Sequence, residues 1–287
     1  MRKVNKDFNN PPQALQDCFS QKEINLLENK TNHSFDSRCY NQSVINELKD
    51  LYHNKCAYCE SFLLNNITIE HYRPKKNGYY WLGYEWSNLL PTCTTCNNSK
   101  GDKFEISGIR IREPFKLNGK LDLNRCKADC DEFLNEKPLI IHPEIDEPKD
   151  FFYFDETGSI KPKDENLKAK KTIEILKLDN QSLLLKRKKV IDDLFFSLES
   201  SSIRFLEYLS ETNNIYTENE LKLAFFPLYD KLIYIQNEEL EFTLLSSELL
   251  DRFDYFFLDK IERNYSKELK NLIQQSFLLY IKIYLQK

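Results

Sequence analysis

The chain has 287 residues, of which 41% are hydrophobic and 30% charged, and its formal net charge at pH 7 is -4. This length and hydrophobic content suffice for a real core in one large or two ordinary domains. No uninterrupted apolar stretch approaches the roughly 20 residues of a membrane span. The N-terminus also lacks the apolar core of a secretory signal, so we expect a soluble, cytoplasmic protein with no membrane partner.

The charge is distributed unevenly along the chain. Residues 71–127 carry eleven Lys/Arg against five Asp/Glu, whereas residues 190–265 carry sixteen Asp/Glu against six Lys/Arg. A basic stretch suits a phosphate-rich substrate, and an acidic stretch suits solvent or a partner protein. Ordinary solvated charge is the alternative interpretation of each stretch.

The first part of the chain, 1–50, is predicted to be an N-terminal helical segment. Pro11 and Pro12 precede residues 13–30, and residues 41–55 follow; both stretches have apolar residues at helical spacing. We therefore expect two helices here.

The second part, 51–160, contains all six glycines and most of the cysteines. "ITIEHY" (67–72) alternates apolar and polar residues as a short strand does, and "CTTCNNSKGDKF" (93–104) is typical of a cysteine turn that opens a short helix. "PLIIHP" (138–143) and "FFYFDETGSIKP" (151–162) predict further strands, the latter with a Gly-containing turn.

The third part, 161–287, is predicted to be a C-terminal helical domain. It contains no glycine, and long runs repeat apolar residues at intervals of three and four. Asp179 and Asn180 are candidate N-cap residues for the helix that begins there.

Two C-x-x-C turns, Cys56/Cys59 and Cys93/Cys96, are separated by 33 residues. Each turn directs two thiolates to one point, and two turns supply the four sulfurs of a closed tetrahedral zinc site. We predict structural Zn²⁺ here, with reduced core cysteines that never meet as the alternative. Cys126 and Cys130 have C-x-x-x-C spacing, for which half of a metal site without a visible second half is the alternative; for these two, and for Cys18 and Cys39, we favour structural burial. A disulfide framework is not expected in a reducing cytoplasm.

Glu70-His71, then Asn88 in "NLL", then Asn97 directly after Cys96, woven through the two C-x-x-C turns, resemble an HNH endonuclease over about residues 51–105. The resemblance implies an α+β fold: a small zinc-stapled ββα-metal finger embedded in a mostly α-helical protein. It implies that His71 is the general base that activates water for attack on a phosphodiester.

The same resemblance assigns the other residues of the signature. Glu70 and Asn97 match the positions that hold a catalytic cation, Mg²⁺ or Mn²⁺, separate from the zinc. Asn88 matches the asparagine whose amide braces the loop and the histidine-bearing strand. Here Glu stands where Asp is frequent, and Asn97 stands where many members carry His.

Basic and aromatic residues surround the signature. The basic residues are candidate phosphate contacts: Arg73, Lys75, Lys76, Lys100 and Lys103. The aromatic stretch "GYYWLGYEW" (78–86) either stacks on bases or packs the finger against helices, and we favour packing.

Residues 50–195, including "IEHYRPKK" and "EKPLIIHPEIDEP", resemble PtuB-type nucleases of Septu anti-phage systems and related HNH effectors of retrons. This implies a PtuA-type ABC/SMC-like ATPase partner, and in the retron case a reverse transcriptase and its msDNA. The substrate is then a nucleic acid, with DNA favoured and RNA or tRNA kept as alternatives.

Two other functions remain open. The first is a non-catalytic zinc-finger subunit that binds nucleic acid or assembles the ATPase, and the second is a stand-alone restriction nuclease for modified DNA. His142 and Asp146 lie in the family-like segment, and we interpret them as a structural turn rather than a second functional cluster.

Overall fold

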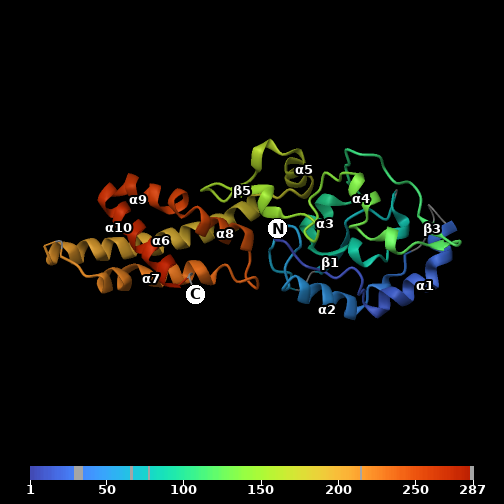
Figure 1. The fold of residues 1–287 in the computed structure, drawn as a ribbon, viewed down its shortest axis with the longest axis horizontal. Coiled ribbons are helices and arrows are strands. Elements are labelled where there is room, and N and C mark those ends of the chain that lie inside the picture. The colour runs from blue at the N-terminus through green and yellow to red at the C-terminus, as the bar shows by residue number, and fades with distance from the viewer. Residues whose placement is uncertain (29–34, 65–66, 77, 214, 285–287) are drawn as a thin grey trace. The chain divides into compact units, whose positions relative to one another are not determined.

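The computed structural model describes residues 1–28, 35–64, 67–76, 78–213 and 215–284 (Figure 1). It divides into two compact units. Unit 1 is Met1–Phe152 with Lys161–Asp179, and unit 2 is Tyr153–Ile160 with Asn180–Lys287. The described residues are mostly helical with three small two-stranded sheets, which confirms the α+β expectation. The three-part division at 50 and 160 stays a prediction.

The N-terminal segment of unit 1 forms the two predicted helices, α1 (Gln13–Glu28) and α2 (Gln42–Leu51). Residues 29 and 30 of the first predicted helix lie outside the described residues. The Asn41 side chain accepts hydrogen bonds from the backbone N–H groups of Ser43 and Val44, which is the N-cap arrangement that starts a helix. A short 3₁₀ turn, Ser37–Cys39, lies between the two helices.

A ββα arrangement forms the centre of unit 1. Strand β1 (Ile67–His71) pairs antiparallel with β2 (Leu89–Cys93), so that Ile67 lies opposite Cys93 and His71 opposite Leu89. Helix α3 (Thr94–Lys100) begins at Cys93 and packs against both strands (Figure 1). The predicted strand and the predicted helix after the cysteine turn are therefore confirmed.

The rest of unit 1 consists of short elements around this centre. One expectation is wrong: "PLIIHP" is not a strand, and only Pro138 forms an isolated bridge, with Ile106. Ile141 donates its N–H to the Thr172 hydroxyl at 2.9 Å instead of to a neighbouring strand. The remaining helices and strands of this part are β3 (Lys116–Leu117), β4 (Lys120–Leu121), α4 (Asp131–Asn135), and α5 (Leu167–Leu176).

The core of unit 1 is rich in aromatic rings. In "GYYWLGYEW" the rings of Tyr79, Trp81, Tyr84 and Trp86 are each at most 2% exposed. Tyr79 packs edge-on against Trp81 and against Phe104. This burial supports packing rather than base stacking for the stretch.

Strands β5 (Phe152–Phe154) and β6 (Ile160–Pro162) form the predicted hairpin, whose turn contains Gly158 at φ +80°. A positive φ of this size favours glycine, because a side chain would be strained there. The turn signal in the sequence therefore placed this hairpin correctly.

Unit 2 is helical, as predicted. The Asn180 side chain accepts from the Leu183 N–H at 3.1 Å and so caps α6 (Gln181–Glu211), which confirms this candidate N-cap. Helix α7 (Glu218–Tyr234) lies along α6 and against α10 (Lys267–Tyr284) (Figure 1). The further helices are α8 (Thr243–Asp251), a π-helical turn (Asp254–Leu258) and α9 (Asp259–Asn264).

Two of the cysteines are not placed as expected. Cys18 of α1 and Cys39 form a disulfide with a Cα–Cα distance of 5.8 Å, whereas no disulfide was expected. Cys126 is buried and Cys130 half-buried, both as free thiols. None of the helices in the described ranges combines the length and apolar character needed to cross a bilayer.

Candidate zinc centre and nuclease site

The four cysteines of the two C-x-x-C turns come together in unit 1. Their sulfur atoms all lie within 4.8 Å of one another, and the Sγ atoms of Cys59 and Cys93 are 3.8 Å apart. Tetrahedral zinc with Zn–S bonds of about 2.3 Å requires sulfur–sulfur separations of about 3.8 Å. Donor type, number and spacing therefore fit a zinc ion at Cys56, Cys59, Cys93 and Cys96.

The zinc-ligand turns also fix the strands beside them. The Ala57 N–H, inside the first turn, donates to the Pro91 carbonyl of β2 at 2.8 Å. Cys93 ends β2 and, through its sulfur, accepts from the Cys96 N–H at the start of α3. The cluster thus joins the end of the β1–β2 pair where Ile67 lies opposite Cys93 to the beginning of α3.

At the other end of β1, a cavity of about 570 Å³ brings three signature residues together. Glu70, His71 and Asn97 all line it, with Lys75, Lys76 and Asp102 among its other lining residues. Glu70 and Asp102 offer carboxylate oxygens and Asn97 offers an amide oxygen, and oxygen donors of these kinds are the ligands that Mg²⁺ and Mn²⁺ prefer. The donor set of this cavity therefore fits a divalent cation.

The His71 ring is held by a backbone carbonyl. Its Nε2 lies 2.9 Å from the Gly83 carbonyl oxygen, which only accepts hydrogen bonds, so we assign the proton to Nε2. Burial lowers the pKa of His71 to about 3, and the nearby Lys75 acts in the same direction. The imidazole is consequently neutral at physiological pH, with an unprotonated Nδ1 that can accept a proton.

Glu70 is paired with a lysine of α3. The Lys100 ammonium lies 2.7 Å from Glu70 Oε1 and 2.9 Å from the His71 carbonyl oxygen, and both side chains are almost fully buried. Burial raises the pKa of Glu70, and the Lys100 charge opposes that shift. Because β1 ends at His71, the carboxylate can reach α3 while the next side chain reaches Gly83.

Asn88 connects the two segments that surround His71. Its Oδ1 accepts from the Arg73 N–H at 2.7 Å, and its Nδ2 donates to the carbonyls of Arg73 at 3.0 Å and Leu82 at 3.1 Å. Arg73 follows His71 by two residues, and Leu82 precedes Gly83. The amide therefore fixes the strand end and the loop that carries the carbonyl acceptor for His71.

Comparison with known proteins agrees with this geometry. The HNH endonuclease family model matches residues 56–103. A Septu protein PtuB of Bacillus mycoides (strain KBAB4) is 32% identical over 224 residues, which cover 69% of this chain and 69% of that protein. The chain belongs to this PtuB family. It is therefore a PtuB-type HNH nuclease, as the sequence signature indicated.

Two other relatives match over smaller shares. A Septu protein PtuB of Bacillus thuringiensis is 42% identical over 57 residues, 19% of this chain and 22% of that protein. A Septu protein PtuA of Bacillus mycoides (strain KBAB4) is 28% identical over 182 residues, 57% of this chain but 24% of that protein.

Two of the predicted phosphate contacts do not fit the structure. Arg73 is 1% exposed, and its Nε pairs with Glu136 Oε2 at 3.0 Å, while Lys100 is 0% exposed and pairs with Glu70. Neither cation can reach a phosphate from these positions, and both instead bind elements of unit 1 together. Lys75 is half-buried, with its ammonium 5.0 Å from the centre of the Tyr40 ring, and Lys76 and Lys103 are exposed.

Sequence reasoning missed three groups at this site: Tyr40, the Gly83 carbonyl and Glu136. The Tyr40 hydroxyl lies 3.2 Å from His71 Nε2, although 31 residues separate the two in sequence. The Glu136 carboxylate accepts a hydrogen bond from Arg73 Nε, 63 residues away in sequence, and another from the Tyr79 hydroxyl at 2.7 Å. No local pattern in the sequence indicates these pairings.

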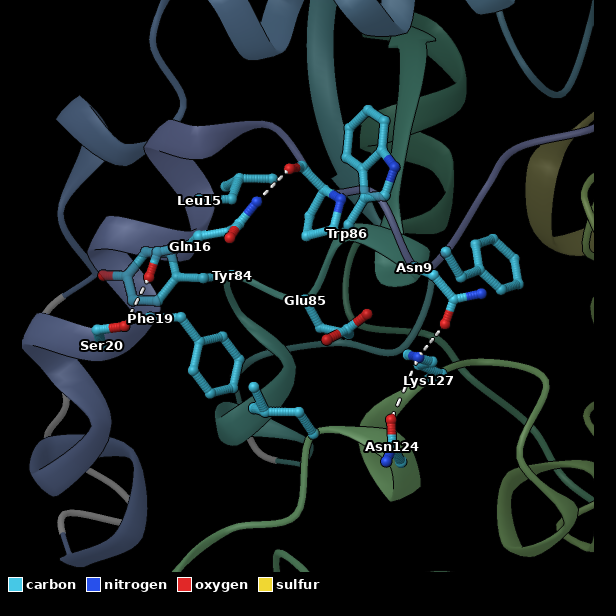
Figure 2. Close-up of a pocket in the computed structure, with 13 residues that line it drawn as sticks. Asn9, Leu15, Gln16, Phe19, Ser20, Tyr84, Glu85, Trp86, Asn124 and Lys127 are labelled. Atoms are coloured by element: carbon cyan, nitrogen blue, oxygen red, sulfur yellow. Dashed lines mark hydrogen bonds between the residues drawn. The ribbon is translucent and has the colours of Figure 1, made fainter.

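A second cavity, of about 310 Å³, shares no lining residue with the first (Figure 2). Figure 2 shows the Glu85 carboxylate between Trp86 and Lys127. One carboxylate oxygen, Oε1, accepts from the N–H and hydroxyl of Ser87, and burial raises the pKa of Glu85 to about 7. This cavity is not part of the HNH signature.

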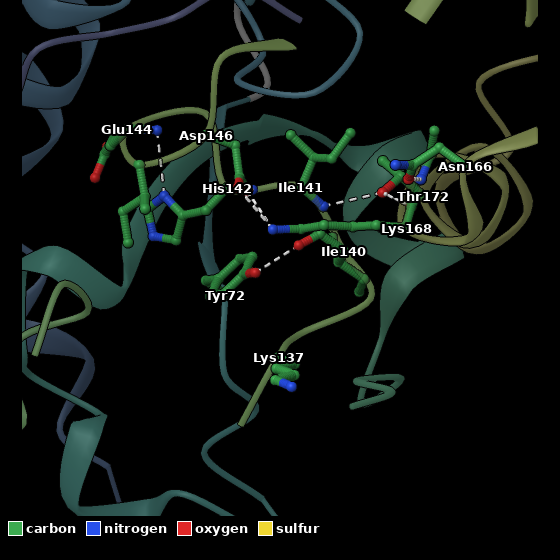
Figure 3. Close-up of polar contacts among 12 residues, drawn as sticks. Tyr72, Lys137, Ile140, Ile141, His142, Glu144, Asp146, Asn166, Lys168 and Thr172 are labelled. Carbon is green, nitrogen blue, oxygen red and sulfur yellow. Dashed lines mark hydrogen bonds and ion pairs between the residues drawn. The ribbon is translucent and has the colours of Figure 1, made fainter. Parts of the chain in front are cut away.

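His142 and Asp146 form a closed turn, which supports the structural interpretation (Figure 3). The His142 N–H donates to Asp146 Oδ2 at 2.7 Å, and His142 Nδ1 accepts from the Glu144 N–H at 3.2 Å. His142 Nε2 lies 3.3 Å from the Ser87 carbonyl oxygen. With both ring nitrogens engaged and the ring 1% exposed, His142 has no lone pair left for a substrate.

Proposed function

We propose that this nuclease is a metal-dependent endonuclease that hydrolyses phosphodiester bonds, with DNA as the favoured substrate. The observation that carries the proposal is the pairing of His71 Nε2 with the Gly83 carbonyl, which leaves Nδ1 as the proton-accepting nitrogen of a residue that lines one cavity with Glu70 and Asn97. A neutral imidazole of this kind takes the proton of the attacking water.

The other residues support that step. Glu70 and Asn97 are the residues that would hold Mg²⁺ or Mn²⁺, which supplies neutralisation of charge on the phosphate and the leaving oxygen. Asn88 orients His71 through the backbone, and Lys76 and Lys103 are exposed cations that suit contacts with flanking phosphates. The zinc cluster stabilises the finger and takes no part in the reaction.

We further propose that the nuclease acts in anti-phage defence with a PtuA-type ATPase in the cytoplasm. The family membership and the similarity to a PtuA sequence support this partner. A retron reverse transcriptase with its msDNA extends the partner set, and co-purification of the tagged chain with each candidate tests the assignment.

The deciding experiment compares wild type with His71→Ala on duplex DNA, single-stranded DNA and tRNA, with Mg²⁺ or Mn²⁺ and with the ATPase present. Cleavage is expected in wild type and lost in His71→Ala, while zinc content stays the same in both. Equal cleavage by the two proteins contradicts the role of His71. Tight, salt-sensitive binding without scission by wild type indicates a binding subunit instead.

A further inference from the structure

Tyr40 contacts the catalytic histidine from outside the finger. It lies between the Ser37–Cys39 turn and α2, upstream of the stretch 56–103 that matches the HNH family. Its hydroxyl is 2.6 Å from the Gly83 carbonyl oxygen and 3.2 Å from His71 Nε2. The two rings also meet edge to face, with centroids 5.6 Å apart and an interplanar angle of 83°.

The chemistry of these three groups fixes where the hydrogens are. The Gly83 carbonyl only accepts, so the Tyr40 O–H donates to it, and the phenol oxygen keeps lone pairs for a second contact. The His71 Nε2–H therefore has two acceptors, the Gly83 carbonyl and the Tyr40 oxygen. Burial raises the pKa of Tyr40, which keeps the phenol protonated and able to donate.

Tyr40 is itself held on both sides. Cys39, the residue before it, is buried at the end of the Ser37–Cys39 turn, and Asn41, the residue after it, caps α2. The Tyr84 ring lies 5.7 Å from the Tyr40 ring. The phenol is thus anchored by neighbours that do not depend on His71.

We propose that Tyr40 is a positioning residue for His71, and that the N-terminal segment is therefore part of the nuclease site. Tyr40 keeps the proton on Nε2 and fixes the plane of the ring, so that Nδ1 stays unprotonated for the attacking water. The inference rests on the proposed role of His71 as general base.

The test is Tyr40→Phe, which keeps the ring and removes the hydroxyl, with Tyr84→Phe as the matched control. Tyr84 is a buried neighbour whose oxygen accepts from the Asp36 N–H at 2.8 Å. Nitrogen-15 NMR of labelled histidine measures the tautomer directly. The chain has four histidines, and the His71 signal is assigned by its loss in His71→Ala.

In wild type and Tyr84→Phe, we expect the Nε2–H tautomer to predominate at His71. In Tyr40→Phe, the Nδ1–H form should become measurable, and kcat should fall about 3- to 10-fold, the size of one hydrogen bond, with KM unchanged. Equal tautomer populations and equal kcat in the two Phe variants overturn the proposal. A tautomer change in Tyr40→Phe, combined with a wild type that cleaves no substrate, supports the positioning role and refutes the nuclease mechanism instead.

Discussion

Replacing Lys100 with methionine tests the ion pair at the end of β1. Methionine keeps much of the apolar stem but removes the ammonium that lies 2.7 Å from Glu70 Oε1, in a pair whose side chains are 0% and 5% exposed. The Glu70 carboxylate is then buried without a cation. Removing one partner of such a pair costs about 3–5 kcal/mol, which corresponds to a fall in Tm of about 6–20 °C.

Urea unfolding followed by tryptophan fluorescence measures this loss of unfolding free energy in unit 1, which contains the ion pair. The chain has two tryptophans, Trp81 and Trp86, and both are buried in unit 1. Lys103→Met is the matched control, because it removes an exposed lysine three residues further on, and its effect should stay within about 0.5 kcal/mol.

Two further measurements separate a charge effect from a packing effect. Lys100→Met combined with Glu70→Gln should recover most of the loss, because no unpaired charge remains. The difference in unfolding free energy between wild type and Lys100→Met should become smaller as pH falls toward 5. Burial already raises the pKa of Glu70 and loss of Lys100 raises it further, so the unpaired carboxylate in the variant takes up a proton and loses its charge. A loss below about 1 kcal/mol, or a double variant no more stable than the single one, refutes the reasoning.

Three other predictions concern Asn88, the zinc cluster and the buried Glu85. Asn88→Ala leaves the Arg73 N–H without its acceptor, so it should cost about 1–3 kcal/mol in urea unfolding and lower the cleavage rate; an unchanged midpoint contradicts the bracing role. Cys59→Ser should remove the zinc, measured by plasma mass spectrometry, and lower the unfolding midpoint of unit 1; full zinc retention contradicts the four-sulfur site. Because the pKa of Glu85 rises in the fold from 4.5 to about 7, native Glu85 binds more protons than the unfolded chain in this range, and wild-type stability should fall with rising pH. Between pH 5 and 8, the unfolding free energy of Glu85→Gln in urea should therefore rise relative to that of wild type by up to about 3 kcal/mol. A difference between the two proteins that does not change with pH contradicts this.

The parts of the fold that the sequence predicted are those with local signals. The apolar spacing of α1 and α2, the alternation in β1 and the cysteine turn before α3 each lie within a few residues, and the structure confirms them. "PLIIHP" has the composition of a strand, but the Ile141 N–H in this stretch donates to the Thr172 hydroxyl and not to a neighbouring strand. Strand propensity cannot specify a pairing partner, so this error was not avoidable from one sequence.

The site shows the same division. Glu70, His71 and Asn97 are close in sequence to the cysteines that mark them, and the structure brings them to one cavity. The basic residues were harder to interpret, because a lysine or arginine beside a nuclease signature suits a phosphate as well as a distant carboxylate. Arg73 forms an ion pair with Glu136, which is distant in sequence and is brought near only by the tertiary fold.

One of the two acceptors for the His71 Nε2 proton, the Gly83 carbonyl, belongs to the main chain, so no side-chain replacement can delete it. Substitutions can only displace it, and the position most sensitive to displacement is Gly83 itself, where an added methyl group would come within 2.0 Å of the Phe35 ring. The Tyr40 oxygen can be removed by one substitution, whereas the main-chain acceptor can only be moved, and Gly83, which carries it, tolerates no larger side chain without a shift of its neighbour.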